Sequence, residues 1–150
     1  MIKIDVLIQN KIWKKYISSP EKYINKKTRY LYKHIPIMKN KNINLSLLLS
    51  GPKEIKYLNK KFRKKNKITD VLSFPFYSQN NINKKIKNSK NLYLGDIILN
   101  HTKIKKKNFK AEFDKLWIHG FLHLLGYKHF KNKDFYKMNK LEKKIFKNIK

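Results

Sequence analysis

Residues 113–129 read Phe-Asp-Lys-Leu-Trp-Ile-His-Gly-Phe-Leu-His-Leu-Leu-Gly-Tyr-Lys-His, and no other stretch of the chain is as informative. From position 113 to 125 the apolar side chains occur on nearly every side of a helix, which predicts a helix buried in the protein interior. Gly126 suits the left-handed backbone that ends a helix. The rest of the chain is therefore expected to cover this helix.

Three histidines stand at metal-ligand spacing in the same stretch. His119 and His123 are four residues apart, so their side chains share one face of the helix. The chain turns at Gly126, and His129 can return as a third ligand. Three neutral imidazoles with an open fourth position are typical of catalytic zinc. The alternative is a set of core or surface histidines, but buried imidazoles need partners. Three of the five histidines of the chain fall within the eleven residues 119–129.

His119 and His123 have the same spacing as in the His-Glu-x-x-His pattern of metalloproteases, but one residue between them differs. The glutamate that acts there as general base is Gly120 here. A peptide hydrolase would lack its usual base. A substrate that supplies its own nucleophile, such as an RNA 2′-hydroxyl, or a reaction that uses a metal-bound hydroxide, fits better.

Outward from this stretch, the patterns predict alternating strands and helices. Strands are expected at 2–8, 43–49, 71–76 and 93–99, from alternation or apolar runs. Helices are expected to begin at Ser19-Pro20-Glu21, ending before Pro36, and at Gly51-Pro52, and to cover 113–125 and 134–149. Residues 78–91 are polar and predict a long loop, and 105–110 a basic connector. The order β-α-β-α-β-β-α-α predicts an α+β or mixed α/β fold around four strands. On the final helix one apolar stripe is expected, formed by Phe135, Met138, Leu141, Ile145 and Ile149.

Composition limits the class of protein. The chain has 150 residues and a mass of 18.2 kDa, enough for one domain, residues 1–150, with a real core. It has no cysteine, which excludes disulfides, iron–sulfur clusters and thiol catalysis. No apolar run approaches a membrane span of about 20 residues. Residues 1–10 alternate and include Asp5, unlike a signal peptide. We expect a cytoplasmic protein without membrane contact.

The charge points to a polyanionic partner. The net charge is +29, from 38 basic against 9 acidic residues, and the only arginines are Arg29 and Arg63. Such an excess favours nucleic acid. Because lysine, asparagine and isoleucine have AT-rich codons, genome composition also explains part of the lysine excess. The retained arginines are therefore more informative than any lysine.

The sequence resembles the YbeY family of bacterial metal-dependent endoribonucleases. The family signature His-Gly-x-Leu-His-Leu-x-Gly-Tyr-Asp-His reads here from His119 to His129, with Lys128 in place of its aspartate. Two further blocks match in order. They run from Leu58-Asn59-Lys60-Lys61-Phe62-Arg63 to Thr69-Asp70-Val71-Leu72-Ser73-Phe74-Pro75, and over Leu94-Gly95-Asp96-Ile97.

The resemblance implies a fold, a cofactor and partners. It implies an α+β domain with a mixed four-stranded sheet, about five helices and a metal site on a central buried helix. One zinc ion would be held by His119, His123 and His129. The activity would be a single-strand-specific endoribonuclease in late 16S rRNA 3′-end maturation and ribosome quality control. Expected partners are rRNA and the small ribosomal subunit, with ribosomal proteins or an Era-type GTPase as protein partners.

Arg63 is where the family places a functionally important arginine. We assign catalytic roles to Arg63 and His119, and substrate binding to Arg63, Lys60 and Lys64 within the basic run around residue 63. A guanidinium forks onto phosphate in a way that lysine does not. The alternative for Arg63 is a structural ion pair with Asp70 or Asp96.

Two other functions stay open from sequence. The chain can be a non-catalytic, RNA-binding ribosome-assembly factor with a structural zinc, or a zinc hydrolase of another substrate such as a peptide. The open fourth ligand position favours catalysis over a structural zinc. The residue at position 120 argues against the peptide hydrolase.

RNA binding should depend strongly on salt and little on sequence. Lysines that neutralise phosphates release counterions, so the logarithm of the affinity should fall roughly linearly with the logarithm of salt concentration. A fluorescence-anisotropy titration of labelled RNA at several salt concentrations measures the slope. An affinity that does not change with salt would reject the electrostatic origin.

Overall fold

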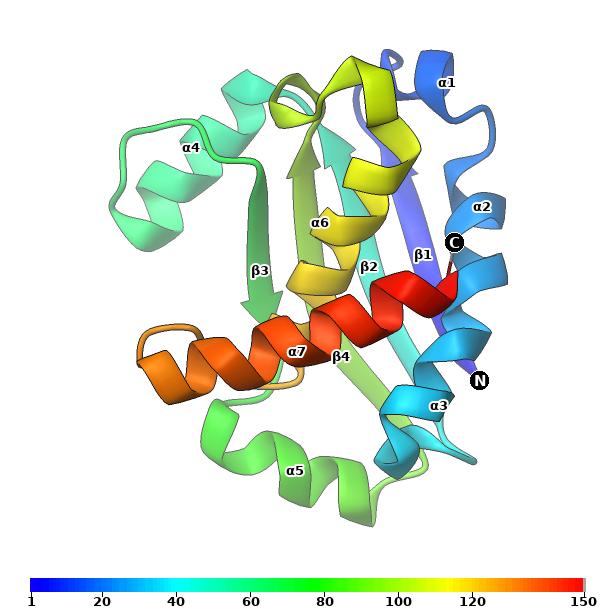
Figure 1. Cartoon of the computed structure of the whole chain (residues 1–150). Coiled ribbons are helices and arrows are strands. Elements are labelled where there is room, and N and C mark those ends of the chain that lie inside the picture. The colour runs from blue at the N-terminus through cyan, green and yellow to red at the C-terminus, as the bar shows by residue number, and fades with distance from the viewer. Residues whose placement is uncertain (150) are drawn as a thin grey trace.

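The computed structural model describes residues 1–149 as an α+β fold around one mixed sheet (Figure 1). Strands β1, β2 and β4 run parallel, and β3 pairs with β4 antiparallel, in the order β1-β2-β4-β3. The expected fold class is confirmed. The strands are β1 (Ile2–Ile8), β2 (Asn42–Ser50), β3 (Val71–Pro75) and β4 (Asn91–Asn100).

Helices lie on both faces of the sheet, unequally. The described helices are α1 (Trp13–Tyr16), α2 (Pro20–Lys27), α3 (Leu31–His34), α4 (Pro52–Arg63), α5 (Gln79–Asn88), α6 (Phe109–Leu124) and α7 (Asn132–Ile149). Short 3₁₀ turns are η1 (Thr28–Tyr30), η2 (Pro36–Met38), η3 (His101–Lys103) and η4 (Lys106–Asn108). In Figure 1, α6 lies along the sheet, and α7 crosses over α6. On the opposite face, α4 packs against the sheet through a small cluster of Ile55, Leu72 and Ile98.

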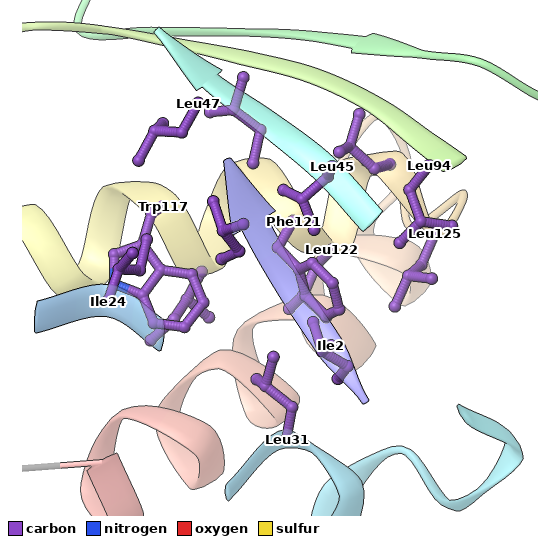
Figure 2. Packing of buried hydrophobic residues seen from close by; sticks show 14 of the residues in the cluster. Ile2, Ile24, Leu31, Leu45, Leu47, Leu94, Trp117, Phe121, Leu122 and Leu125 are labelled. Atoms are coloured by element: carbon purple, nitrogen blue, oxygen red, sulfur yellow. The ribbon is translucent and has the colours of Figure 1, made fainter. Parts of the chain in front are cut away.

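The main core lies between the sheet and α6. Phe113, Trp117, Phe121 and Leu122 are fully buried, as the apolar pattern of this helix predicts. Figure 2 shows three of these side chains gathered with residues of β1, β2, β4, α2 and α3. The helix begins at Phe109, four residues before the expected start. The buried helix is thus held from several sides, which fixes the orientation of its histidines.

Two sequence expectations are wrong. Residues 78–91 do not form a long loop, because most of them form α5. Ile82 and Ile86, one helical turn apart, bury one stripe of an otherwise polar helix. On α7, Phe135 lies off the apolar stripe with 54% of its surface exposed, whereas Met138 and Ile145 are buried as expected.

From the sequence we expect no segment that spans a membrane, and helix length and apolar character bear on this expectation. Among residues 1–149, none of the helices combines the length and the apolar character that crossing a bilayer requires.

Gly120 is a point where α6 comes very close to the sheet. A Cβ built at this position would lie 2.8 Å from Ile97 Cγ2 of β4 and 3.2 Å from Ser73 Oγ of β3. The Ser73 hydroxyl donates to the Gly120 carbonyl at 3.3 Å. Ile97 Cγ2 branches next to the backbone and has little freedom to move aside. A glycine is therefore required here by packing, and a glutamate has no space.

Gly120→Ala should destabilise the protein, although alanine is the better helix former by about 1 kcal/mol. Overpacking a core costs about 1–3 kcal/mol, which leaves a net loss of up to about 2 kcal/mol after the gain in helix propensity. Urea unfolding followed by circular dichroism measures it. A gain in the free energy of unfolding would contradict the close approach.

Candidate metal centre

The three predicted histidines meet at the end of α6. Their ligand nitrogens all lie within 4.8 Å of one another, and this is the cluster of the described residues that can hold a metal ion. His119 and His123 are half-buried on α6, and His129 is exposed on the segment that follows it. The other two histidines, His34 and His101, lie outside the cluster.

The turn after α6 both returns the chain and orients a histidine. Gly126 has φ +92°, and the Tyr127 amide donates to the Leu122 carbonyl at 3.1 Å, which ends the helix. The Tyr127 carbonyl then accepts from Nδ1 of His123 at 2.9 Å. One glycine conformation therefore turns the chain back towards His129 and positions the acceptor for His123.

His119 is oriented from a different element. Its Nδ1 donates to Oε1 of Glu142, on α7, at 2.5 Å. The carboxylate can only accept, so a proton sits on Nδ1, which leaves Nε2 as the ring nitrogen available to a metal. This carboxylate–histidine arrangement is typical of metal sites, where it fixes the ring and raises its basicity as a ligand.

The donor set fits a cation. Nε2 of His119 and Nε2 of His123 face each other at 3.0 Å. Both rings donate an Nδ1 proton to another group, so the facing Nε2 atoms are the ones left for a metal ion. Burial and the neighbouring His119 ring lower the pKa of His123 to about 4, which keeps this imidazole neutral at pH 7. Two facing imidazole nitrogens are stabilised by a positive ion between them, and divalent zinc takes such nitrogens.

A positively charged cleft of about 370 Å³ opens onto the histidines. Arg63 and Lys65 come from the end of α4, Lys128 from the turn after α6, and Ser73 from β3. Phe130, directly after the third histidine, also lines the cleft. The cleft thus combines the possible metal ligands with cations suited to phosphate.

Arg63 is anchored at the wall of this cleft. Its guanidinium donates to the Ser73 carbonyl at 3.1 Å. Within residues 1–149 it makes no ion pair with Asp70 or Asp96, so the alternative structural role lacks its partner. Ser73 itself is buried against Gly120, in keeping with a packed strand residue. A guanidinium has five N–H donors, so one bond leaves most of them for a ligand.

The two lysines predicted to bind substrate lie outside the cleft. Lys60 and Lys64 are exposed and do not line the cleft, whereas Lys65 does. The reason is the end of α4, where Lys64 takes a left-handed conformation with φ +56°. The Lys65 amide closes the turn on the Asn59 carbonyl at 3.2 Å, and the chain changes direction there. RNA binding by Lys60 and Lys64 stays a prediction.

Sequence reasoning did not single out three residues of the site. Glu142 stands on a lysine-rich helix and is one of nine acidic residues in the chain. Lys65 was one of several similar lysines, and Phe130 follows the histidine motif without a pattern of its own. Only the packing of α7 on α6 and the turn after α4 single them out.

Comparison with known proteins agrees with this geometry. The family described as Endoribonuclease YbeY matches residues 7–150. This chain belongs to the endoribonuclease YbeY family. Proteins named Endoribonuclease YbeY from Pelagibacter ubique and Bartonella henselae are 47% and 32% identical to it. The first alignment covers 100% of this chain and 97% of the relative, and the second 99% and 94%. As a YbeY family member the protein is a nuclease, that is, a hydrolase of RNA.

The fold also matches a solved structure. A solution structure of a Thermotoga maritima protein aligns with a TM-score of 0.60 at 24% identity, over 99% of this chain and 89% of that one. At this identity the match supports the fold alone. The sequence matches therefore show the family, and the structural match supports the fold.

Removing the Glu142 carboxylate should weaken metal binding. Because it holds His119 by its Nδ1 proton, Glu142→Ala should lower the affinity for divalent metal by about 10- to 100-fold. Titration with zinc against a competing chelator measures this. Glu112→Ala, which removes a glutamate paired with Lys115 on the outer side of α6, is the control and should bind as the parent does. Equal affinities for both variants would show that Glu142 does not position the ligand.

Proposed function

We propose that this protein is a single-strand-specific, metal-dependent endoribonuclease that acts late in 16S rRNA 3′-end maturation and in ribosome quality control. The observation that carries the proposal is the convergence of three imidazoles and an arginine on one open cleft. The proposal assigns one zinc ion per chain to His119, His123 and His129, and one functional domain to residues 1–150.

The chemistry divides between the ion and the protein side chains. When bound, a divalent ion here supplies Lewis-acid polarisation of a phosphoryl oxygen and lowers the pKa of a coordinated water. His119 and His123 provide neutral nitrogen ligands, and Glu142 and the Tyr127 carbonyl hold their rings in place. The proposed catalytic role of His119 is therefore that of a ligand, since its other ring nitrogen is occupied by Glu142.

Arg63 is the residue proposed to hold the scissile phosphate. It lies in the same cleft as the histidines, and its bond to the Ser73 carbonyl orients the guanidinium on a rigid strand. Two parallel N–H donors match the oxygens of a phosphate, and they stabilise the negative charge that builds up during cleavage. Lys65 and Lys128 add positive charge along the cleft wall.

The two competing functions fit the site less well. A structural zinc usually has four protein ligands, whereas here three side chains converge and the cleft leaves room for a substrate. A peptide hydrolase of the His-Glu-x-x-His type needs a glutamate where the sheet packs directly against Gly120. Both observations support RNA cleavage.

The cellular setting extends the proposal. The proposed partners are rRNA and the small ribosomal subunit, with ribosomal proteins or an Era-type GTPase as protein partners. The proposed compartment is the cytoplasm. Zinc is the proposed metal because three neutral imidazoles form the donor set.

Arg63→Lys should slow RNA cleavage much more than it weakens RNA binding. The charge is kept, so long-range attraction persists, but the two-pronged donor is lost. We expect a rate loss of about 10- to 100-fold, or about 1.4–2.7 kcal/mol, under single-turnover conditions with metal-loaded protein. Cleavage as fast as that of the parent would remove the phosphate role of Arg63.

His123→Ala is the companion variant for the same assay. It should abolish metal binding and cleavage while much of the lysine-driven RNA binding remains. If the metal-loaded parent cleaves no rRNA substrate, the assembly-factor function takes its place, and Lys128 becomes the first residue to exchange.

A further inference from the structure

Phe130 is an exposed aromatic residue at the mouth of the cleft. Its relative exposure is 85%, the highest among the exposed large hydrophobic residues described. One face of its ring stacks on the imidazole of His129, with the centroids 5.6 Å apart and the planes 14° apart. The other face has no ring partner in residues 1–149. Such a side chain contributes little to the core, so its position calls for another explanation.

The surroundings of this ring indicate what can cover it. The cleft that Phe130 lines also contains Arg63, Lys65 and Lys128, which suit a phosphate backbone. Flat aromatic faces beside a cationic groove are the usual elements of single-strand binding, where bases stack on the rings and phosphates follow the charges. We propose that Phe130 is the stacking platform for one unpaired nucleobase of the RNA held in the cleft.

This inference rests on the proposed function and adds the means by which the cleft selects single strands. In a duplex, both faces of each base are covered by its neighbours, so no base can lie on an outside ring without leaving the stack. Unstacking a paired base costs a few kcal/mol, whereas a base in a loop or an open end is already available. Because the ring stacks on His129, the base would lie directly beside the metal centre.

The chain offers a matched control for this residue. Phe135 is also exposed, at 54%, but it lies on α7 and does not line the cleft. The native tryptophans, Trp13 and Trp117, are fully buried and should not respond to a base on the surface. An indole placed at either phenylalanine position is therefore a specific reporter.

The first experiment uses Phe130→Trp and Phe135→Trp in the metal-loaded full chain. Each is titrated with an unstructured 2′-O-methyl oligoribonucleotide, and its integrity is checked on a gel afterwards. Stacking should quench the fluorescence of the indole in Phe130→Trp and leave that of Phe135→Trp unchanged. No quenching in Phe130→Trp, or equal quenching in both variants, overturns the proposal.

The second experiment measures affinity. Phe130→Ala should bind the single strand about 5- to 150-fold more weakly than the parent, the range for loss of one base–aromatic stack, with an unchanged salt slope. Phe130→Tyr should restore binding, and a long blunt-ended duplex without a loop should bind parent and Phe130→Ala equally. Zinc affinity should be the same in all variants. If Phe130→Ala binds the single strand as the parent does, or loses its zinc, the stacking role is wrong.

The two proposals fail separately. If no variant cleaves RNA but Phe130→Trp is quenched and Phe130→Ala binds weakly, the stacking site holds and the catalytic proposal falls. If cleavage is normal in Phe130→Ala and its affinity for RNA is unchanged, the catalytic proposal holds and the stacking site falls.

Discussion

The rest of the structure depends on how closely α6 approaches the sheet at Gly120. With no side chain at this position, the helix backbone lies against Ile97 and Ser73, and the large apolar residues before and after it can bury themselves on both sides. Packing on the sheet fixes the rotation of the helix about its own axis, because interiors are close-packed and tolerate little adjustment. That rotation determines where the neighbouring His119 and the later His123 point, so the metal centre follows from a packing contact.

The site is then completed by elements that contact α6 from different directions. A turn at Gly126 brings back His129 and supplies the carbonyl that holds His123, while α7 supplies Glu142 to hold His119. Arg63 comes from α4 on the other side of the sheet and reaches the cleft through its bond to β3. Because each histidine on α6 has its own support, a change in one supporting element should disturb one ligand before it disturbs the fold.

The sequence predicts the parts of this protein that depend on local periodicity and spacing. The four strands and the buried helix follow from apolar patterns, and the three histidines follow from their spacing around a glycine. The helix α5 was missed because only Ile82 and Ile86 mark its buried face, and two residues make a weak pattern. Glu142 and Lys65 were missed for a different reason, since their roles depend on the packing of α7 on α6 and on the left-handed turn at Lys64. Such contacts between distant segments leave no local signal.

The distribution of charge around the metal centre bears on how the cofactor and the RNA affect each other. Arg63, Lys65 and Lys128 line the cleft, and positive charges close to a cation site oppose the binding of a divalent ion. Neutral ligands and the Glu142 carboxylate reduce this cost, and exposure of the lysines to solvent screens much of it. A bound phosphate offsets the remaining repulsion between the cleft cations and the metal ion, because its negative charge lies close to both. Binding of metal and RNA should therefore reinforce each other, and by linkage each must raise the affinity for the other by the same factor.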